Sequence, residues 1–132
     1  MKKFLVAAAL LAACGPVSAE ENPYTGAWTS TGCGKGIQCR IEIEQKSKTA
    51  YGLRFVVADG RDARKVRCEV SADMERGPLE FTKSHHYDDG LMGRFPDDTV
   101  WLVINGGGDI SLTTLQKCKG VEIYGDYGFI GD

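Results

Sequence analysis

The chain has 132 residues, of which 42% are hydrophobic, and it carries 16 Lys and Arg against 18 Asp and Glu. This length predicts one domain with a single core. The densest basic stretch, residues 61–67, is interrupted by Asp62, whereas binding to a phosphate backbone requires clustered cations. We therefore expect no nucleic acid among the partners.

The first 19 residues have the three parts of a secretory leader. Lys2 and Lys3 precede an apolar stretch over residues 4–13, and residues 17–19, Val-Ser-Ala, supply the small side chains that signal peptidase requires. The apolar stretch is too short to span a bilayer stably. We expect residues 1–19 to be a signal peptide and residues 20–132 to form the mature domain, which keeps 14 basic and 18 acidic residues.

A second cleavage site is also consistent with this leader. Residues 11–14, Leu-Ala-Ala-Cys, resemble the bacterial lipobox, in which the cysteine is lipidated and becomes the new N-terminus. Five cysteines leave one without a disulfide partner, and either cut accounts for it, by removing Cys14 or by placing lipid on it. Both alternatives predict an exported protein, periplasmic or anchored by lipid to the outer membrane, whose other thiols are oxidised.

Apolar residues alternate with polar ones through most of the mature region. Cys39, Ile41 and Ile43, for example, share one face of their segment, and charged side chains occupy the other. This period of two is typical of antiparallel strands with one buried and one solvated face. Turn-forming sequences separate the runs, as at residues 59–60 and 76–78. The expected strands cover residues 28–30, 38–45, 50–58, 65–73, 78–83, 91–95, 99–105, 109–115 and 121–130.

Short strands at this spacing predict a sandwich or a closed barrel. We favour an all-β antiparallel meander barrel of eight or nine strands, because closure removes the exposed edges of a small sheet. In such a barrel Cys33, Cys39, Cys68 and Cys118 lie at one rim, which predicts two disulfides with three possible pairings. Strands two apart lie about 9.6 Å from each other, which disfavours a bond between Cys39 and Cys68.

The start of the mature domain brings a resemblance to a known group. Residues 24–28, Tyr-Thr-Gly-Ala-Trp, are similar to the Gly-x-Trp opening of the first strand in calycin-type barrels, which include lipocalins and small bacterial protease inhibitors. The resemblance implies that Trp28 closes the floor of the barrel and that Gly26 lets the strand bend beneath it. The chain departs from long lipocalins in ending on a strand-like segment, residues 124–129, where they have a helix.

Residues 99–104 are apolar on both faces. Since the outer face of a one-layer barrel is normally solvated, Trp101 and Val103, or the opposite set, need a cover. We expect a loop or the C-terminal segment to supply it. The alternative is that this strand forms a homodimer or a partner-binding edge, because exposed apolar patches tend to mark interfaces.

One cluster, His85 and His86 with the acidic residues after them, has metal-ligand chemistry. Adjacent residues on a strand point to opposite faces, and a catalytic zinc site needs three protein ligands where the chain has only these two histidines. We expect residues 84–89 to form a solvated loop and expect no metal site.

Three further patterns do not meet the requirements of a catalytic or cofactor site. Cys33 and Cys39 are too far apart for a Cys-x-x-Cys redox or zinc motif. Residues 105–109, Asn-Gly-Gly-Gly-Asp, precede a strand where a phosphate cradle needs a helix, so they predict a hairpin turn. The carboxylate pairs at residues 88–89 and 97–98 lie in hydrophilic, turn-like sequence that does not tune a general acid. We expect no catalytic residues and no cofactor.

These observations favour an exported, non-catalytic binding protein of the bacterial cell envelope. We expect it to bind a protein, such as a secreted hydrolase that it inhibits, because inhibition needs only a rigid loop on a scaffold. The candidate binding residues are His85, Tyr87 and Trp101. The alternative is a carrier of a small apolar ligand, with a barrel lined by residues such as Tyr51, Phe55, Phe81 and Trp101.

Overall fold

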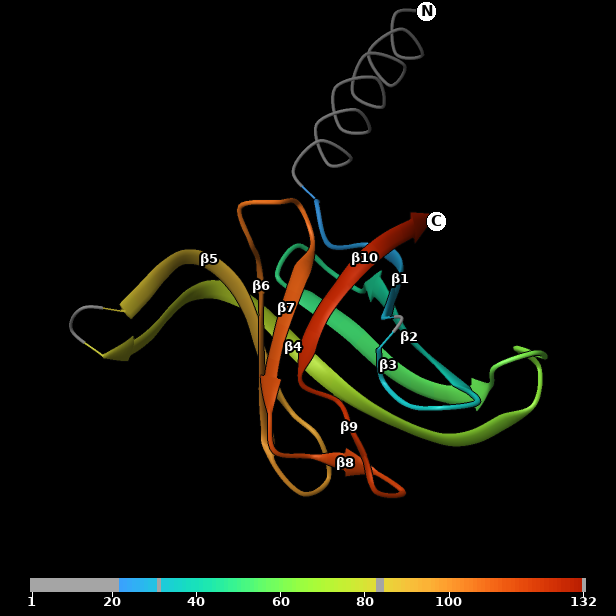
Figure 1. Ribbon diagram of the computed structural model, residues 1–132. Helices are drawn as coiled ribbons and strands as arrows, with labels where there is room; N and C mark the ends of the chain where they lie inside the picture. The colour runs from blue at the N-terminus through green and yellow to red at the C-terminus, as the bar shows by residue number, and fades with distance from the viewer. Residues whose placement is uncertain (1–21, 31, 83–84, 132) are drawn as a thin grey trace, which may run out of the picture.

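A closed antiparallel barrel of eight strands forms the body of the protein (Figure 1). The computed structural model describes residues 22–30, 32–82 and 85–131, and these residues contain strands and no helix. Neighbouring strands follow the order β1-β10-β7-β6-β5-β4-β3-β2, and β8 and β9 form a separate two-stranded sheet. The strands are β1 (Gly26–Ser30), β2 (Ile37–Gln45), β3 (Ala50–Asp59), β4 (Val66–Thr82), β5 (His85–Arg94), β6 (Thr99–Ile104), β7 (Ile110–Thr114), β8 (Lys117–Cys118), β9 (Val121–Glu122) and β10 (Gly125–Gly131). The prediction of an all-β meander barrel is confirmed.

The alternating pattern of the sequence determines which side chains face the interior. Ile41 on β2 pairs with Phe55 on β3, and Phe55 pairs with Val70 on β4. Ile41 and Phe55 are fully buried, whereas the charged neighbours Glu42 and Arg54, which pair with each other, face outward. Because the side-chain period of a strand is two, this register places the alternating residues of the run on the core side, as at Leu53, Phe55 and Val57.

The barrel closes where β1 meets β10. Trp28 pairs with Phe129 and packs edge-to-face against its ring, with the centroids 5.0 Å apart. The Trp28 indole is 3% exposed, and its Nε1–H donates to the carbonyl of Tyr24 at 3.0 Å. Gly26, at the start of β1, has a φ of 135°, in the region that glycine alone adopts without strain.

Two disulfides join the strands at one mouth of the barrel, as predicted. They link Cys33 to Cys39 and Cys68 to Cys118, with Cα–Cα separations of 6.2 and 5.8 Å. Cys39 and Cys68 both pair with Val57 across β3, so the four residues share a rim although Cys39 and Cys68 are not bonded. The second disulfide holds the β8–β9 sheet against β4.

A long hairpin of β4 and β5 reaches beyond the barrel on the left of the view (Figure 1). We call residues 77–82 of β4 and 85–90 of β5 the arm. Two predictions are wrong here: residues 76–78 are not a turn, and residues 85–89 belong to a strand, not to a loop. The Pro78 position has no cross-strand partner, since Gly77 pairs with Gly90 and Leu79 already pairs with Tyr87. Pro78 therefore lies at a bulge, a position at which strands tolerate proline.

The arm covers the outer face of β6. A Cβ placed on Gly90 would meet Leu79 Cδ1 at 2.6 Å and the Leu102 carbonyl at 2.9 Å, so Leu79 lies over the boundary between β5 and β6. Phe81 packs edge-to-face on Trp101 at 5.4 Å, and Val103 is only 9% exposed. The expected cover over residues 99–104 thus exists, and Phe81 of the arm, which was not predicted, contributes to it.

Side chains fill the interior of the barrel. Buried residues from β1 to β7 and β10 form one continuous core, in which the rings of Phe55 and Tyr127 meet at 6.5 Å and those of Tyr24 and Tyr51 at 5.8 Å. The hydroxyl of Tyr127 donates to the carbonyl of Ile123 inside this core. Interior positions of small barrels are normally occupied in this way.

Candidate functional site

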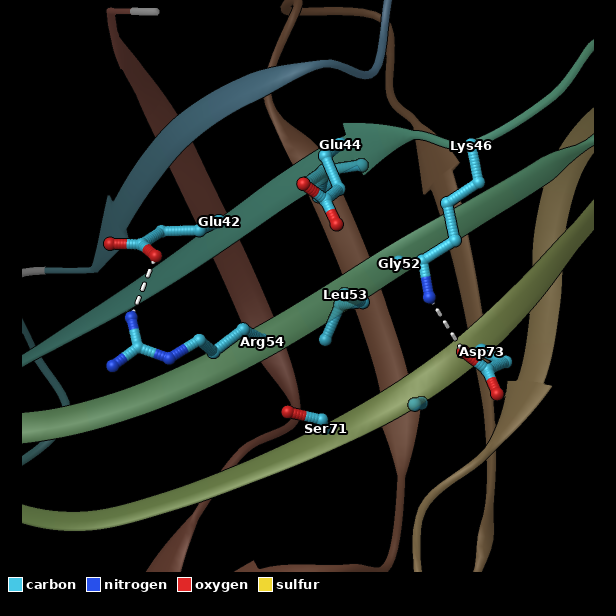
Figure 2. Close-up of a pocket in the computed structure, with 10 residues that line it drawn as sticks. Glu42, Glu44, Lys46, Gly52, Leu53, Arg54, Ser71 and Asp73 are labelled. Atoms are coloured by element: carbon cyan, nitrogen blue, oxygen red, sulfur yellow. Dashed lines mark hydrogen bonds and ion pairs between the residues drawn. The ribbon is translucent and has the colours of Figure 1, made fainter.

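Charged side chains line a shallow hollow on the outer face of β2, β3 and β4 (Figure 2). It has a volume of about 280 Å³, and its floor includes Gly52. Because Gly52 has no side chain, Lys46 crosses above it and its Nζ reaches Asp73 on β4 at 3.1 Å. A second bridge in the hollow joins Arg54 to Glu42 at 2.7 Å (Figure 2).

These charges neutralise one another. Arg54 also binds Glu69 through both carboxylate oxygens, and Arg40 donates to Glu42. Burial alone would raise the pKa of Glu42, but the hydrogen bonds from Arg40 and Arg54 outweigh it and hold the pKa below its usual value. The hollow is a network of solvent-facing cross-strand pairs, which stabilise a sheet modestly.

A second cluster lies at the root of the arm. Arg76 of β4 binds Asp89 of β5 through two parallel hydrogen bonds of 2.9 and 2.8 Å, and its third nitrogen donates to the Tyr51 hydroxyl at 3.3 Å. The guanidinium also lies 5.2 Å from the centre of the Tyr24 ring. Since Tyr24 precedes β1, this cluster ties the N-terminal segment to the arm.

The ionisation of this cluster follows from its geometry. Burial alone would raise the pKa of Asp89, but hydrogen bonds from Arg76 and Tyr24 hold it below its usual value. Burial, assisted by the hydrogen bond to Asp89, raises the pKa of Tyr24 well above its usual value, so the phenol stays protonated. The four side chains thus bind one another as donors and acceptors, and they fix the root of the arm to β3 and the N-terminal segment.

This cluster was not predicted from the sequence. Arg76 was placed in a turn and Asp89 in a loop, and they lie 13 positions apart. They become neighbours only through the pairing of β4 with β5, for which no local signal exists.

An aromatic cluster covers the outward face of the arm. Phe81 lies between two rings, 5.9 Å from Tyr87 and 5.4 Å from Trp101, both edge-to-face. Phe81 and Tyr87 remain 40% and 39% exposed. Two of the residues predicted to bind a partner, Tyr87 and Trp101, thus meet through Phe81. Phe81 and Trp101 do not line the interior, as a carrier would require, because Phe81 lies on the same outer face of β4 as Ser71 and Gly77.

The histidines lie at the tip of the same arm. His86 is exposed, with its Nε2 4.0 Å from an oxygen of Asp88. His85 belongs to β5, but the orientation of its side chain lies outside the described structure, as does Ser84. No group of three His, Cys, Asp or Glu side chains gathers anywhere in the described ranges in a way that could hold a metal ion.

An apolar hollow lies beside the aromatic cluster on the outer face of β6 and β7. It has a volume of about 430 Å³ and is lined chiefly by Trp101, Leu112, Leu115 and Tyr124. Leu115 and Tyr124 are 84% and 57% exposed, the former being the most exposed large hydrophobic side chain described. Trp101 belongs to both features, so the arm and this β6–β7 hollow form one continuous apolar surface.

The carboxylates and glycines of the other predicted motifs build turns. Asp98 Oδ2 accepts the backbone N–H of Leu115 at 2.7 Å, and Asp97 accepts from the amide of Gln116. The Asn105 backbone N–H donates to the carbonyl of Asp109 at 2.8 Å, which closes the hairpin predicted at residues 105–109.

The predicted leader, residues 1–19 with Cys14, lies outside the described residues, and within the described part no helix has the length and apolar character needed to cross a membrane. Two disulfides are compatible with an exported protein. Comparison of the chain with protein-family models, curated proteins and solved structures finds no match of any kind.

Proposed function

We propose that this chain is an exported, non-catalytic binding protein of the bacterial cell envelope, and that its partner is another protein. The observation that carries the proposal is the distribution of apolar surface. Tyr51 and Phe55, which a carrier would use to line a cavity, are fully buried against neighbouring rings. Phe81 and Tyr87, in contrast, face solvent on the arm. Exposed aromatic clusters are typical of protein interfaces.

The construction of the arm supports an inhibitor-like mode of binding. Its base is fixed by the paired hydrogen bonds between Arg76 and Asp89, and one edge of its aromatic cluster, Phe81, packs on Trp101 of the barrel. A projecting hairpin held in this way loses little conformational entropy on binding, which favours affinity. A projecting hairpin of this kind can insert into the active-site cleft of a secreted hydrolase and block it, and this needs no catalytic residue in the inhibitor.

The test is site-specific photocrosslinking in the native envelope. A benzophenone amino acid replaces Tyr87 in the full-length chain, and a matched variant carries it at Val66, which is similarly exposed at the disulfide mouth. We expect a discrete protein adduct from position 87 and none from position 66. Adduct identification by mass spectrometry and assay of the captured protein with added mature chain then test inhibition.

Two results would contradict the proposal. One is the absence of a protein adduct at position 87 while the chain is present and folded in the envelope. The other is recovery of the purified chain with a stoichiometric small apolar ligand, detected in an organic extract, which would favour the carrier alternative. The intact mass of the purified chain also distinguishes the two leader cuts, because lipid on Cys14 adds mass that cleavage after Ala19 does not.

A further inference from the structure

The β6–β7 hollow combines apolar walls with one carboxylate at its edge. Trp101 and Leu112 belong to the strands that form its floor, and the exposed side chains of Leu115 and Tyr124 contribute to its walls. Asp98 is the one charged residue among those that line it. An apolar depression with few polar groups is the usual form of a recognition site, because the apolar area supplies affinity and the polar group supplies orientation.

The structure holds the Asp98 carboxylate in place and leaves one of its oxygens available. Oδ2 accepts the backbone N–H of Leu115 at 2.7 Å and the hydroxyl of Thr114 at 3.4 Å. Oδ1 accepts no hydrogen bond from any residue that the structure describes. A fixed carboxylate with a free oxygen is preorganised to bind a cation, since charge-assisted hydrogen bonds are the strong ones.

The surroundings of the hollow are also acidic. The charged residues within two positions of a lining residue are Asp97, Asp98, Lys117, Glu122 and Asp126. Arg94, which pairs with Thr99 on β6, adds a second cation. Four carboxylates against two cations leave a local charge of −2. This local excess of negative charge, with Asp98 itself in the lining, attracts a basic partner and raises its rate of association.

A second copy of this chain does not fit the surface well. A two-fold dimer presents the same patch from both sides. It would therefore bring two patches of the same negative charge together, and like charges across an interface are unfavourable. A basic protein with a protruding apolar side chain does not meet this obstacle.

We propose that the β6–β7 hollow receives an apolar side chain from the protein partner, and that a neighbouring Lys or Arg of that partner pairs with Asp98 Oδ1. This inference rests on the proposed function and adds the chemistry of the partner: a basic protein whose contact segment carries an exposed apolar residue beside a cation. Leu115 and Tyr124 contact the apolar group, and Asp98 selects for the cation.

Fluorescent peptides of defined composition test the inference on the mature, oxidised chain. The probe is a short peptide of alternating Lys and Leu, and the comparison peptides replace Lys by Glu or Leu by Ser. The variants are Asp98→Asn, which keeps an oxygen for the Leu115 N–H, and Leu115→Ser. Matched controls are Glu44→Gln, an exposed carboxylate on β2, and Ile130→Ser on β10, where Ile130 is 57% exposed away from the hollow.

We expect the Lys–Leu peptide to bind at least about tenfold more tightly than either comparison peptide, which corresponds to about 1.4 kcal/mol. Asp98→Asn and Leu115→Ser should each weaken it by a similar factor, while the two controls leave it unchanged. Its affinity should fall as salt rises, and Asp98→Asn should reduce that dependence. Urea unfolding of each variant separates lost contacts from lost folding.

The inference is overturned if the Glu–Leu peptide binds as tightly as the Lys–Leu peptide. It is equally overturned if folded Asp98→Asn binds like the original chain, or if Ile130→Ser loses as much affinity as Leu115→Ser. None of these results affects crosslinking at Tyr87, so the proposed function stands or fails separately.

Discussion

The two disulfides should differ in their contribution to stability because they close chain segments of different length. The bond between Cys68 and Cys118 spans 50 positions, and that between Cys33 and Cys39 spans 6. In the chain-entropy treatment, the longer loop corresponds to about 4 kcal/mol and the shorter one to about 2 kcal/mol. The expected difference is therefore about 2 kcal/mol, a large part of the net stability of a small domain.

The two pairs are matched in other respects, which makes the comparison direct. Each has one fully buried member, Cys39 at 0% and Cys118 at 1% exposed, and one half-buried member, Cys33 or Cys68. Replacing either pair by alanine therefore removes similar sulfur volume from similar surroundings, so the packing cost largely cancels between the two variants.

Urea unfolding of the mature chain and of the two double variants, Cys33→Ala with Cys39→Ala and Cys68→Ala with Cys118→Ala, measures the difference. We expect the second to lose about 2 kcal/mol more than the first in free energy of unfolding, with a larger rise in the dependence on urea as its unfolded state expands. Equal losses, or a greater loss from the short loop, would refute the loop-length argument.

Three further predictions follow from the barrel and the root of the arm. Gly93→Ala should cost about 1–3 kcal/mol in a urea titration, because its Cβ would collide with the backbone of Asp73, whereas Gly106→Ala, in open space, should change little. Asp89→Asn should cost about 1 kcal/mol near neutral pH. Since the folded state lowers the pKa of Asp89, that cost should disappear as pH falls through about 4 and below, and a constant difference would contradict the ion pair. Tyr24→Phe, which removes a donor to Asp89, should raise the pKa of this carboxyl in an NMR titration.

The barrel could be predicted because the alternation of apolar and polar residues that specifies its strands lies within short stretches of sequence. Alternation in the segments that contain Ile41 and Phe55 determines which face is buried, and the order of these runs is enough for a meander. The rim positions of the cysteines were predictable for the same reason. The choice between pairings was not, since the bond between Cys68 and Cys118 depends on how the β8–β9 sheet folds back on β4.

The arm was predicted wrongly because glycine and proline occur both in turns and at bulges within strands. Gly77 and Pro78 are typical of turns, yet both are also tolerated at a bulge within a long strand. Once the turn was placed there, Arg76 and Asp89 fell outside the strands, and their ion pair could not be inferred. Trp101 was identified as needing a cover, but the sequence carries no signal that Phe81 provides it.

The arm has a consequence for how the protein behaves when it is crowded among other chains. Among the described residues, the two strands of the arm pair only with each other beyond the barrel, so each has an outer backbone edge with no neighbouring strand. An exposed strand edge of this kind can pair with a strand of another chain and lead to aggregation. Here the bulge at Pro78 and a second register shift between Glu80 and Thr82 interrupt the regular spacing of backbone groups that such pairing needs. The hairpin can therefore project aromatic rings into solvent without recruiting misfolded neighbours through its backbone.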